Sequence, residues 1–217
     1  MAKIETNQEN WKLVGGRLCL DFINTVGGRA DSGAVLRDKL ASYDDLLEWS
    51  RFAGIVKPAE VHQLTRRAAS HRQNARAALT RAILLRESLY RVFQSTAEGR
   101  RPRTADLDIL SRELRISRAH QRLTQASGAI VWTWDDANNA LDRILWPVTL
   151  SAAEVLTSAD LSRLRQCEGS ECGWMFLDTS RNRSRHWCDM KDCGNRAKVR
   201  RFRKRQTRTP RQTPARK

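Results

Sequence analysis

Apolar residues recur every three or four positions along most of residues 42–120, which is the spacing of amphipathic helices. The pattern predicts helices that begin near Ser42 and Pro58, a longest helix from about Gln73 to Ala97, and a further helix beyond residue 102. Ser42 and Asp45 match a capping box, and proline is favoured at the first position of a helix. The pattern therefore predicts a mainly helical body.

Other segments depart from this spacing. Residues 15–28 are an apolar stretch bracketed by glycine pairs, whose length suits either a buried strand or a short helix. Residues 121–125 and 129–134 are rich in β-branched and aromatic residues and are joined through Ala126-Ser127-Gly128, which predicts a two-stranded hairpin. Helical spacing returns before Pro147, where a helix is expected to end, and Ser151 with Glu154 predicts the start of the next helix.

Four of the five cysteines lie near the C-terminus in two close pairs, Cys167 with Cys172 and Cys188 with Cys193. Two such pairs can surround one Zn²⁺ with a tetrahedron of thiolates. The N-terminus has no export signal, so clustered thiols are expected to be metal ligands rather than disulfides. The sequence thus predicts one structural Zn²⁺ per chain, and the alternative is four reduced cysteines without metal. The remaining Cys19 is expected to be a small buried residue.

The formal net charge of +16 is concentrated at the C-terminal end. Residues 1–180 contain 25 Lys and Arg against 22 Asp and Glu, whereas residues 181–217 contain 15 against 2. No acidic residue follows Cys193. A near-neutral body with a strongly basic appendage is typical of nucleic-acid binding, and the alternative is a solvated charged helix face.

The two cysteine pairs enclose an apolar run at residues 174–177 and a polar turn at residues 178–185, and the basic helix is expected to begin near Cys193. The predicted fold class is α+β: a mainly α-helical body with a small β-hairpin, plus a C-terminal treble-clef-like zinc finger. We expect the helical domain to span residues 1–160, the zinc finger with its basic helix residues 161–206, and a disordered basic tail residues 207–217.

Four short segments of the C-terminal region form a recognisable set: residues 167–174 (CEGSECGW), residues 178–185 (DTSRNRSR), Trp187-Cys188 with Met190, and Cys193-Gly194-Asn195-Arg196. Together they resemble the CGNR zinc-finger family, whose name is spelled by the last segment. Residues 16–25 (GRLCLDFINT) and Leu145-Trp146-Pro147 resemble the ABATE domain, which precedes this finger in bacterial proteins described as stress-induced transcription regulators. The resemblance implies a bacterial DNA-binding regulator of transcription.

Cations of the polar turn and of the basic helix are the candidates for contact with nucleic acid. Phosphate contacts are expected to dominate affinity, while an asparagine or an arginine reads base edges. DNA is the expected partner, and RNA binding or a protein-interaction role is the alternative. The candidate residues are Arg181, Arg183, Arg185, Asn195, Arg196, Lys198, Arg200, Arg201, Arg203, Lys204 and Arg205.

In the body, a few polar residues interrupt the apolar stretch at residues 15–28. They are expected to form a satisfied buried network, and the tryptophans to be part of the core. The alternative is a sensing pocket for a small-molecule effector, formed by Asp21, Asn24, Thr25, Trp132, Trp134 and Trp146. The N-terminal domain would then be a sensor or an oligomerisation module, and a homo-oligomer is left open.

No catalytic site is predicted, so we expect a protein that is not an enzyme. His62, His71 and His120 have no partnered nucleophile or carboxylate pattern, and the glycine pairs lack the spacing of a phosphate-binding loop. A zinc ion held by four cysteines has no open coordination position. No apolar run approaches eighteen residues, which excludes an ordinary membrane span. We therefore expect a cytoplasmic, nucleoid-associated protein.

Overall fold

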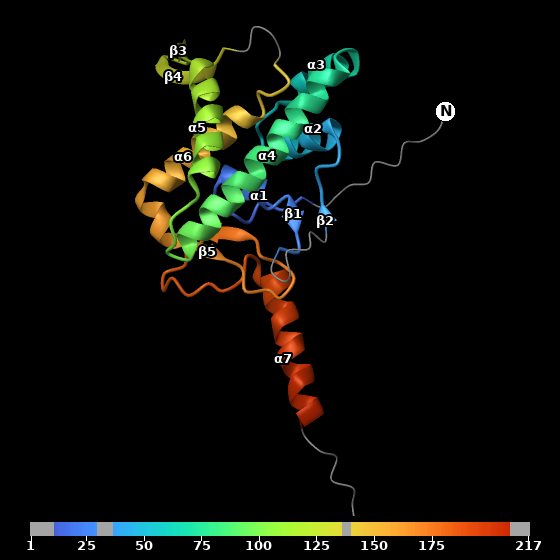
Figure 1. Cartoon of the computed structure of the whole chain (residues 1–217), viewed down its shortest axis with the longest axis vertical. Helices are drawn as coiled ribbons and strands as arrows, with labels where there is room; N and C mark the ends of the chain where they lie inside the picture. Colours follow the sequence, from blue (N-terminus) through green and yellow to red (C-terminus); the bar gives the residue numbers. More distant parts are fainter. Residues whose placement is uncertain (1–10, 30–36, 136–139, 209–217) are drawn as a thin grey trace, which may run out of the picture.

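The computed structural model describes residues 11–29, 37–135 and 140–208, and Figure 1 shows their arrangement. The body is built mainly from helices, and a small finger at its lower side carries the last helix away from it. The longer helices of the body are α2 (Tyr43–Phe52), α3 (Pro58–Ser70), α4 (Arg72–Ala97), α5 (Thr104–Ala119) and α6 (Leu145–Thr157). Within these residues the strands form three separate antiparallel pairs, so the predicted α+β class with a mainly helical body is confirmed.

The helix starts follow the capping signals in the sequence. The Ser42 hydroxyl accepts a hydrogen bond from the Asp45 N–H, and the Asp45 carboxylate accepts one from the Ser42 N–H. This reciprocal pairing satisfies N–H groups that have no partner within the helix. Pro58 occupies the first position of α3, as predicted.

The apolar stretch between the glycine pairs is a short helix, α1 (Leu18–Ile23). Its entry is tight, because a Cβ atom at Gly15 would lie 2.6 Å from the Cβ of Leu20. The Asp21 carboxylate accepts a hydrogen bond of 2.8 Å from the Gly15 N–H and holds the entry loop against the helix. Burial raises the pKa of Asp21 to about 6, although the N–H donors of the loop act in the opposite direction.

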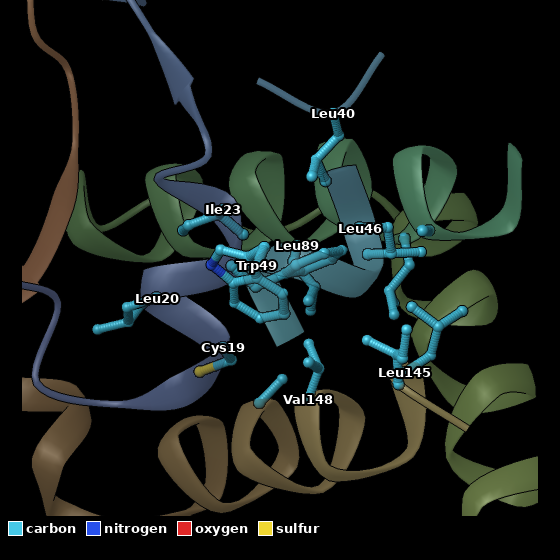
Figure 2. Packing of buried hydrophobic residues seen from close by; sticks show 14 of the residues in the cluster. Cys19, Leu20, Ile23, Leu40, Leu46, Trp49, Leu89, Leu145 and Val148 are labelled. Carbon is cyan, nitrogen blue, oxygen red and sulfur yellow. The ribbon is translucent and has the colours of Figure 1, made fainter. Parts of the chain in front are cut away.

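The main hydrophobic core lies around α1, which packs against α4 and α6 (Figure 2). Trp49 of α2 is fully enclosed, and its ring lies 5.0 Å from that of Phe22. Cys19 faces the same core as a buried residue, and burial raises the pKa of its thiol to about 12. The prediction that Cys19 is a small buried residue is therefore confirmed.

The predicted hairpin is present as β3 (Gln121–Ala126) and β4 (Ala129–Trp134), paired in antiparallel register. Its turn places Ser127 at φ 50° and Gly128 at φ 81°. Two consecutive left-handed residues are the requirement of a type I′ turn, whose twist matches that of the strands. The Ser-Gly pair therefore determines the register of the hairpin.

Two expectations about α6 are wrong. Pro147 does not end a helix, because α6 begins at Leu145 and proline lies in its first turn. Proline is tolerated there, since the N–H groups of the first turn have no partner within the helix. Ser151 lies inside α6 rather than at its start, and its hydroxyl accepts a hydrogen bond from the Cys19 N–H. A short 3-10 helix, η1 (Ala159–Arg163), follows after a cap at Ser158.

The C-terminal region begins with β5 (Leu164–Gln166), which pairs with β6 (Met175–Leu177), and ends with the π-helical turn η2 (Met190–Gly194) and α7 (Asn195–Arg208). Leu164, Met175 and Leu177 all belong to the main core of the body. The domain boundary at residue 160 stays a prediction, but packing crosses it. Of the predicted tail, residues 209–217 lie outside the described residues, and residues 207–208 continue α7.

A third strand pair, β1 (Val26–Gly27) with β2 (Arg37–Asp38), lies beside the finger.

Among the described residues, no helix is both long and apolar enough to cross a membrane.

Asn24 joins α1 to β6 by a pair of buried hydrogen bonds. Its side-chain amide donates to the Met175 carbonyl oxygen at 2.8 Å, and its side-chain oxygen accepts from the Met175 N–H at 2.9 Å. This pairing imitates that of a neighbouring strand and satisfies two backbone groups inside the core.

We predict that Asn24→Ala lowers the free energy of unfolding by about 2–4 kcal/mol, because it leaves both Met175 backbone groups buried without a partner. The measurement is urea denaturation of the full chain followed by circular dichroism. Asn74→Ala serves as the matched control, since Asn74 is exposed on α4, and we expect its effect to stay within about 0.5 kcal/mol. Equal stability of the two variants would contradict the role of Asn24.

Candidate metal centre

The four C-terminal cysteines converge on one point although they come from separate segments. Cys167 follows β5, Cys172 ends the loop after it, Cys188 precedes η2, and Cys193 lies within η2. All four are buried, together with Phe176, in a second small core.

The geometry of the sulfur atoms fits one tetrahedral metal ion. All four Sγ atoms lie within 4.8 Å of one another, and none is part of a disulfide. The Cys172–Cys188 and Cys188–Cys193 sulfur pairs are separated by 3.6 and 3.7 Å. Four sulfurs at about 2.3 Å from a central Zn²⁺ would lie roughly 3.8 Å apart. The four cysteines therefore hold one structural Zn²⁺.

The electrostatics of the cluster favour a cation once more than one of the thiols is ionised. Hydrogen bonds from the Cys172 and Cys188 thiols lower the pKa of Cys167, and the same contacts raise the pKa of both donors. Without a cation, a negative charge on one sulfur thus opposes ionisation of its neighbours. Zn²⁺ removes this conflict, because coordination deprotonates the thiols and offsets their charge.

The loop between the first two ligands is tightly packed at Gly169. A Cβ atom there would lie 3.1 Å from the Cys172 Cβ and 3.2 Å from the Cys193 sulfur. Close approach of this backbone also lets the Gly169 N–H donate to the Cys167 sulfur at 3.4 Å, and the Cys188 N–H donates to the same atom at 3.3 Å. Such outer hydrogen bonds orient metal ligands and reduce their charge.

Each residue of the segment Cys193-Gly194-Asn195-Arg196 has an identifiable role. Cys193 is a ligand, and Gly194 leaves space for Met190, whose sulfur would lie 3.1 Å from a Cβ at that position. The Asn195 amide donates to the Lys191 carbonyl at 3.0 Å, across the start of α7. The Arg196 guanidinium donates to the Cys193 sulfur at 3.3 Å and forms an ion pair with Asp192.

His186 is not among the residues around the metal site. Its Nδ1 atom lies 2.8 Å from a carboxylate oxygen of Glu168, and both side chains are exposed. The side chain is therefore on the surface of the finger.

The three arginines of the polar turn do not share one environment. Arg181 and Arg183 are exposed, whereas the Arg185 guanidinium lies 4.5 Å from the centre of the Phe176 ring. Arg185 also donates to the carbonyl oxygens of Trp187 and Cys188, so its guanidinium already forms hydrogen bonds within the finger. Sequence reasoning placed Arg185 and Arg196 with the candidates for nucleic acid, but both contact the metal module itself.

Helix α7 leaves the finger and extends away from the rest of the molecule (Figure 1). One side of α7 faces a groove of about 420 Å³, whose opposite wall includes Glu168 and Glu171. The cations on this side are Arg196, Arg200, Arg201, Lys204 and Arg205. Lys198 and Arg203 are also exposed but do not line the groove. The cationic surface therefore covers more than one face of the helix.

The six residues of the alternative pocket are dispersed. Asn24 bonds to β6, and the Thr25 hydroxyl donates to the Phe22 carbonyl and accepts from Arg86. Trp146 is buried in the core, where the His120 ring stacks on it at 3.9 Å and Trp134 lies at 5.6 Å. Trp132 is exposed on β4. Asp21, Asn24 and Thr25 thus bond to protein partners, whereas among the described residues the buried indole N–H of Trp146 has no hydrogen-bond partner. A ligand pocket at these residues stays a prediction.

Contacts between body and metal loop were not found by sequence reasoning. The Arg29 N–H donates to the Cys172 carbonyl at 3.2 Å, and the Tyr90 hydroxyl lies 3.4 Å from the Gly173 carbonyl. The Trp174 indole N–H donates to the Val26 carbonyl at 2.7 Å. The sequence gives little sign of these contacts. Tyr90 and Trp174 each combine an apolar ring with a hydrogen-bonding group, but the sequence does not show which carbonyl oxygen that group contacts.

We predict that the purified, reduced protein contains one Zn²⁺ per chain and that Cys188→Ser abolishes this binding, because three thiolates leave the shell incomplete. The finger should then unfold, while most of the helical circular dichroism of the body remains. Elemental analysis checks the stoichiometry. Cys19→Ala is the control, since Cys19 lies in the other core and should leave zinc content unchanged. A Cys188→Ser protein with a full zinc complement would refute the assignment.

Comparison with protein families agrees with this geometry. A model named ABATE, described as "Putative stress-induced transcription regulator", matches residues 16–159, and the model of the CGNR zinc finger matches residues 163–206. No curated protein matches the chain significantly. The second match includes all four zinc ligands and nearly all of α7. Because the two models together span most of the chain, the protein belongs to the ABATE family and carries a CGNR zinc finger after its helical body.

Proposed function

We propose that this protein is a DNA-binding regulator of transcription that docks on duplex DNA through α7. The observation that carries the proposal is the position of this helix: it begins two residues after the zinc ligand Cys193 and projects from the body with its cations exposed. A rigid base holds the helix in one direction, and its charge matches a phosphate backbone. The family description, which is one of transcription regulators, supports the same function.

The contacts of individual side chains divide the candidate residues into two groups. Arg185 and Arg196 stabilise the finger through backbone and sulfur acceptors, so their loss would act on folding first. Arg200 and Arg201 are exposed and line the groove beside α7. These two arginines are the best candidates for direct phosphate contact, with the exposed Arg181 and Arg183 beside the metal loop as further contacts.

The body has a separate role in this proposal. It would hold the finger and respond to an effector or bring copies of the chain together. RNA binding by the same helix is the alternative, and a pure protein-interaction role is a second one. Both alternatives rely on the same exposed helix, so they must be separated by experiment.

We predict that binding of duplex DNA weakens with salt, with a log–log slope of roughly −4 to −6, since about 4–7 phosphates would be neutralised. Arg200→Ala with Arg201→Ala should weaken binding to every sequence and flatten this slope by about one to two units. Fluorescence anisotropy over a range of salt concentrations measures both effects. Zinc content of the double variant must equal that of the wild type.

A matched control removes the same charge elsewhere. Arg72 and Arg76 are exposed at the N-terminal end of α4, which lies away from α7 in Figure 1. Their double alanine variant should keep the wild-type slope. An equal loss in both double variants would indicate binding by overall charge alone. Tighter binding to a matched RNA duplex would favour the RNA alternative, and no binding to either would leave the protein-interaction role.

A further inference from the structure

The β3–β4 hairpin exposes an apolar face that continues outward from the core. Side chains alternate along a strand, so Leu123, Ile130 and Trp132 point to the same side as Trp134, which lies against the buried Trp146. Leu123 is 59% exposed, Ile130 75% and Trp132 62%. These three residues are the apolar hairpin face.

The opposite side of the hairpin is more polar: it carries Arg122, Thr124 and Thr133 together with one large apolar residue, Val131, which is 38% exposed. Gln121 and Gln125 lie on the same side as the three apolar residues. The hairpin is thus amphipathic, with its apolar side uncovered. Within the described part of the chain β3 and β4 pair only with each other, and a two-stranded hairpin is marginally stable unless one face is packed. Exposed apolar patches of this kind are often functional, which makes the hairpin face a candidate interaction surface.

The rest of the chain offers little that would cover this face. Residues 1–10 contain only Met1 and Ile4 as large apolar residues, and residues 136–139 and 209–217 contain none. Residues 30–36 contain Val35 and Leu36, but both ends of that segment are fixed beside the finger, through Arg29 and β2. Within residues 11–29, 37–135 and 140–208, β3 pairs with no strand but β4, and the three apolar side chains keep most of their surface exposed.

We propose that the apolar hairpin face binds the same face of a second copy of this chain, forming a two-fold symmetric dimer. An isologous contact uses the same patch on both subunits, so the three apolar side chains of one hairpin would face the same three of the other. The hairpin and α7 lie at opposite ends of the molecule (Figure 1). Two copies that meet at their hairpins therefore keep their strongly cationic helices apart, and the nearly balanced bodies approach without strong repulsion.

The available area determines how strong this association is. At roughly 150–250 Å² for a large side chain, the exposed fractions of the three residues amount to about 300–500 Å² per hairpin. Two hairpins would bury about 600–1,000 Å² from these side chains alone, near the lower limit for a specific interface. We therefore expect a reversible dimer that dissociates on dilution, rather than a permanent one.

Sedimentation equilibrium of the zinc-loaded full chain, without DNA, tests the dimer. The wild type should change with concentration from 24.9 kDa to twice this mass. Trp132→Asp and Ile130→Asp should each give a monomer at all concentrations, because they bury a charge at the centre of the contact. Ala129→Asp is the matched control: it adds the same charge next to Ile130 on the opposite side of the hairpin, and it should leave the dimer intact.

The masses of the wild type and the variants decide whether the hairpin face forms the dimer. A wild-type chain that stays monomeric at every concentration, or a Trp132→Asp chain that still dimerises, overturns the proposal. If an aspartate variant loses helical circular dichroism, the neutral double variant Leu123→Ser with Ile130→Ser is measured instead. It should be monomeric at all concentrations, and a dimer of this variant overturns the proposal. The dimer does not rest on DNA binding: the Arg200 and Arg201 variant should dimerise like the wild type, so failure of one proposal leaves the other standing.

Discussion

Four sulfur atoms within 4.8 Å of one another cannot all be negative unless a cation lies between them, and the architecture of the C-terminal region depends on this requirement. The ligands come from β5, the loop after it, and both ends of the segment that leads into α7. One ion therefore fixes the distance and direction of α7 relative to the strand pair. Apolar packing alone would do so weakly, because the only fully buried side chain of the second core besides the ligands is Phe176 within the described residues, and Val14, Trp174 and Trp187 pack against it half-buried.

The metal module is also joined to the body, so α7 is positioned by the whole molecule. β6 contributes Met175 and Leu177 to the main core, and Asn24 binds the Met175 backbone from α1. The carbonyl of ligand Cys172 accepts a hydrogen bond from the Arg29 N–H beside β1. A change in the position of α1 or β1 would thus reach a zinc ligand through direct contacts. This is a physical route by which the state of the body can alter the base of the projecting helix.

The sequence predicted the features that local chemistry decides and missed those that distant contacts decide. Ser42 with Asp45 and the Ser127-Gly128 turn specify their elements through neighbours in the chain, and the cysteine pairs carry the metal site in their spacing. Pro147 was misjudged because a proline signals either the first turn or the end of a helix. Sequence could not decide between strand and helix for residues 18–23, since length suited both. Arg185 and Arg196 look like free cations in a charge count, and only coordinates reveal their carbonyl and sulfur acceptors.

The charge on α7 carries a cost that the rest of the structure must offset. Eight of its fourteen residues are Lys or Arg, and like charges repeat at a spacing of four, as in Arg196 with Arg200 and Arg201 with Arg205. Such pairs destabilise an isolated helix by a few tenths of a kcal/mol each. The only two acids after residue 180 are Asp189 and Asp192, and both pair with Lys12 at the base of the finger. The outer turns of α7 therefore have no acidic neighbour in sequence, and the acids that face them across the groove are Glu168 and Glu171. A polyanion that binds along these turns would reduce the repulsion between their cations and so stabilise the helix.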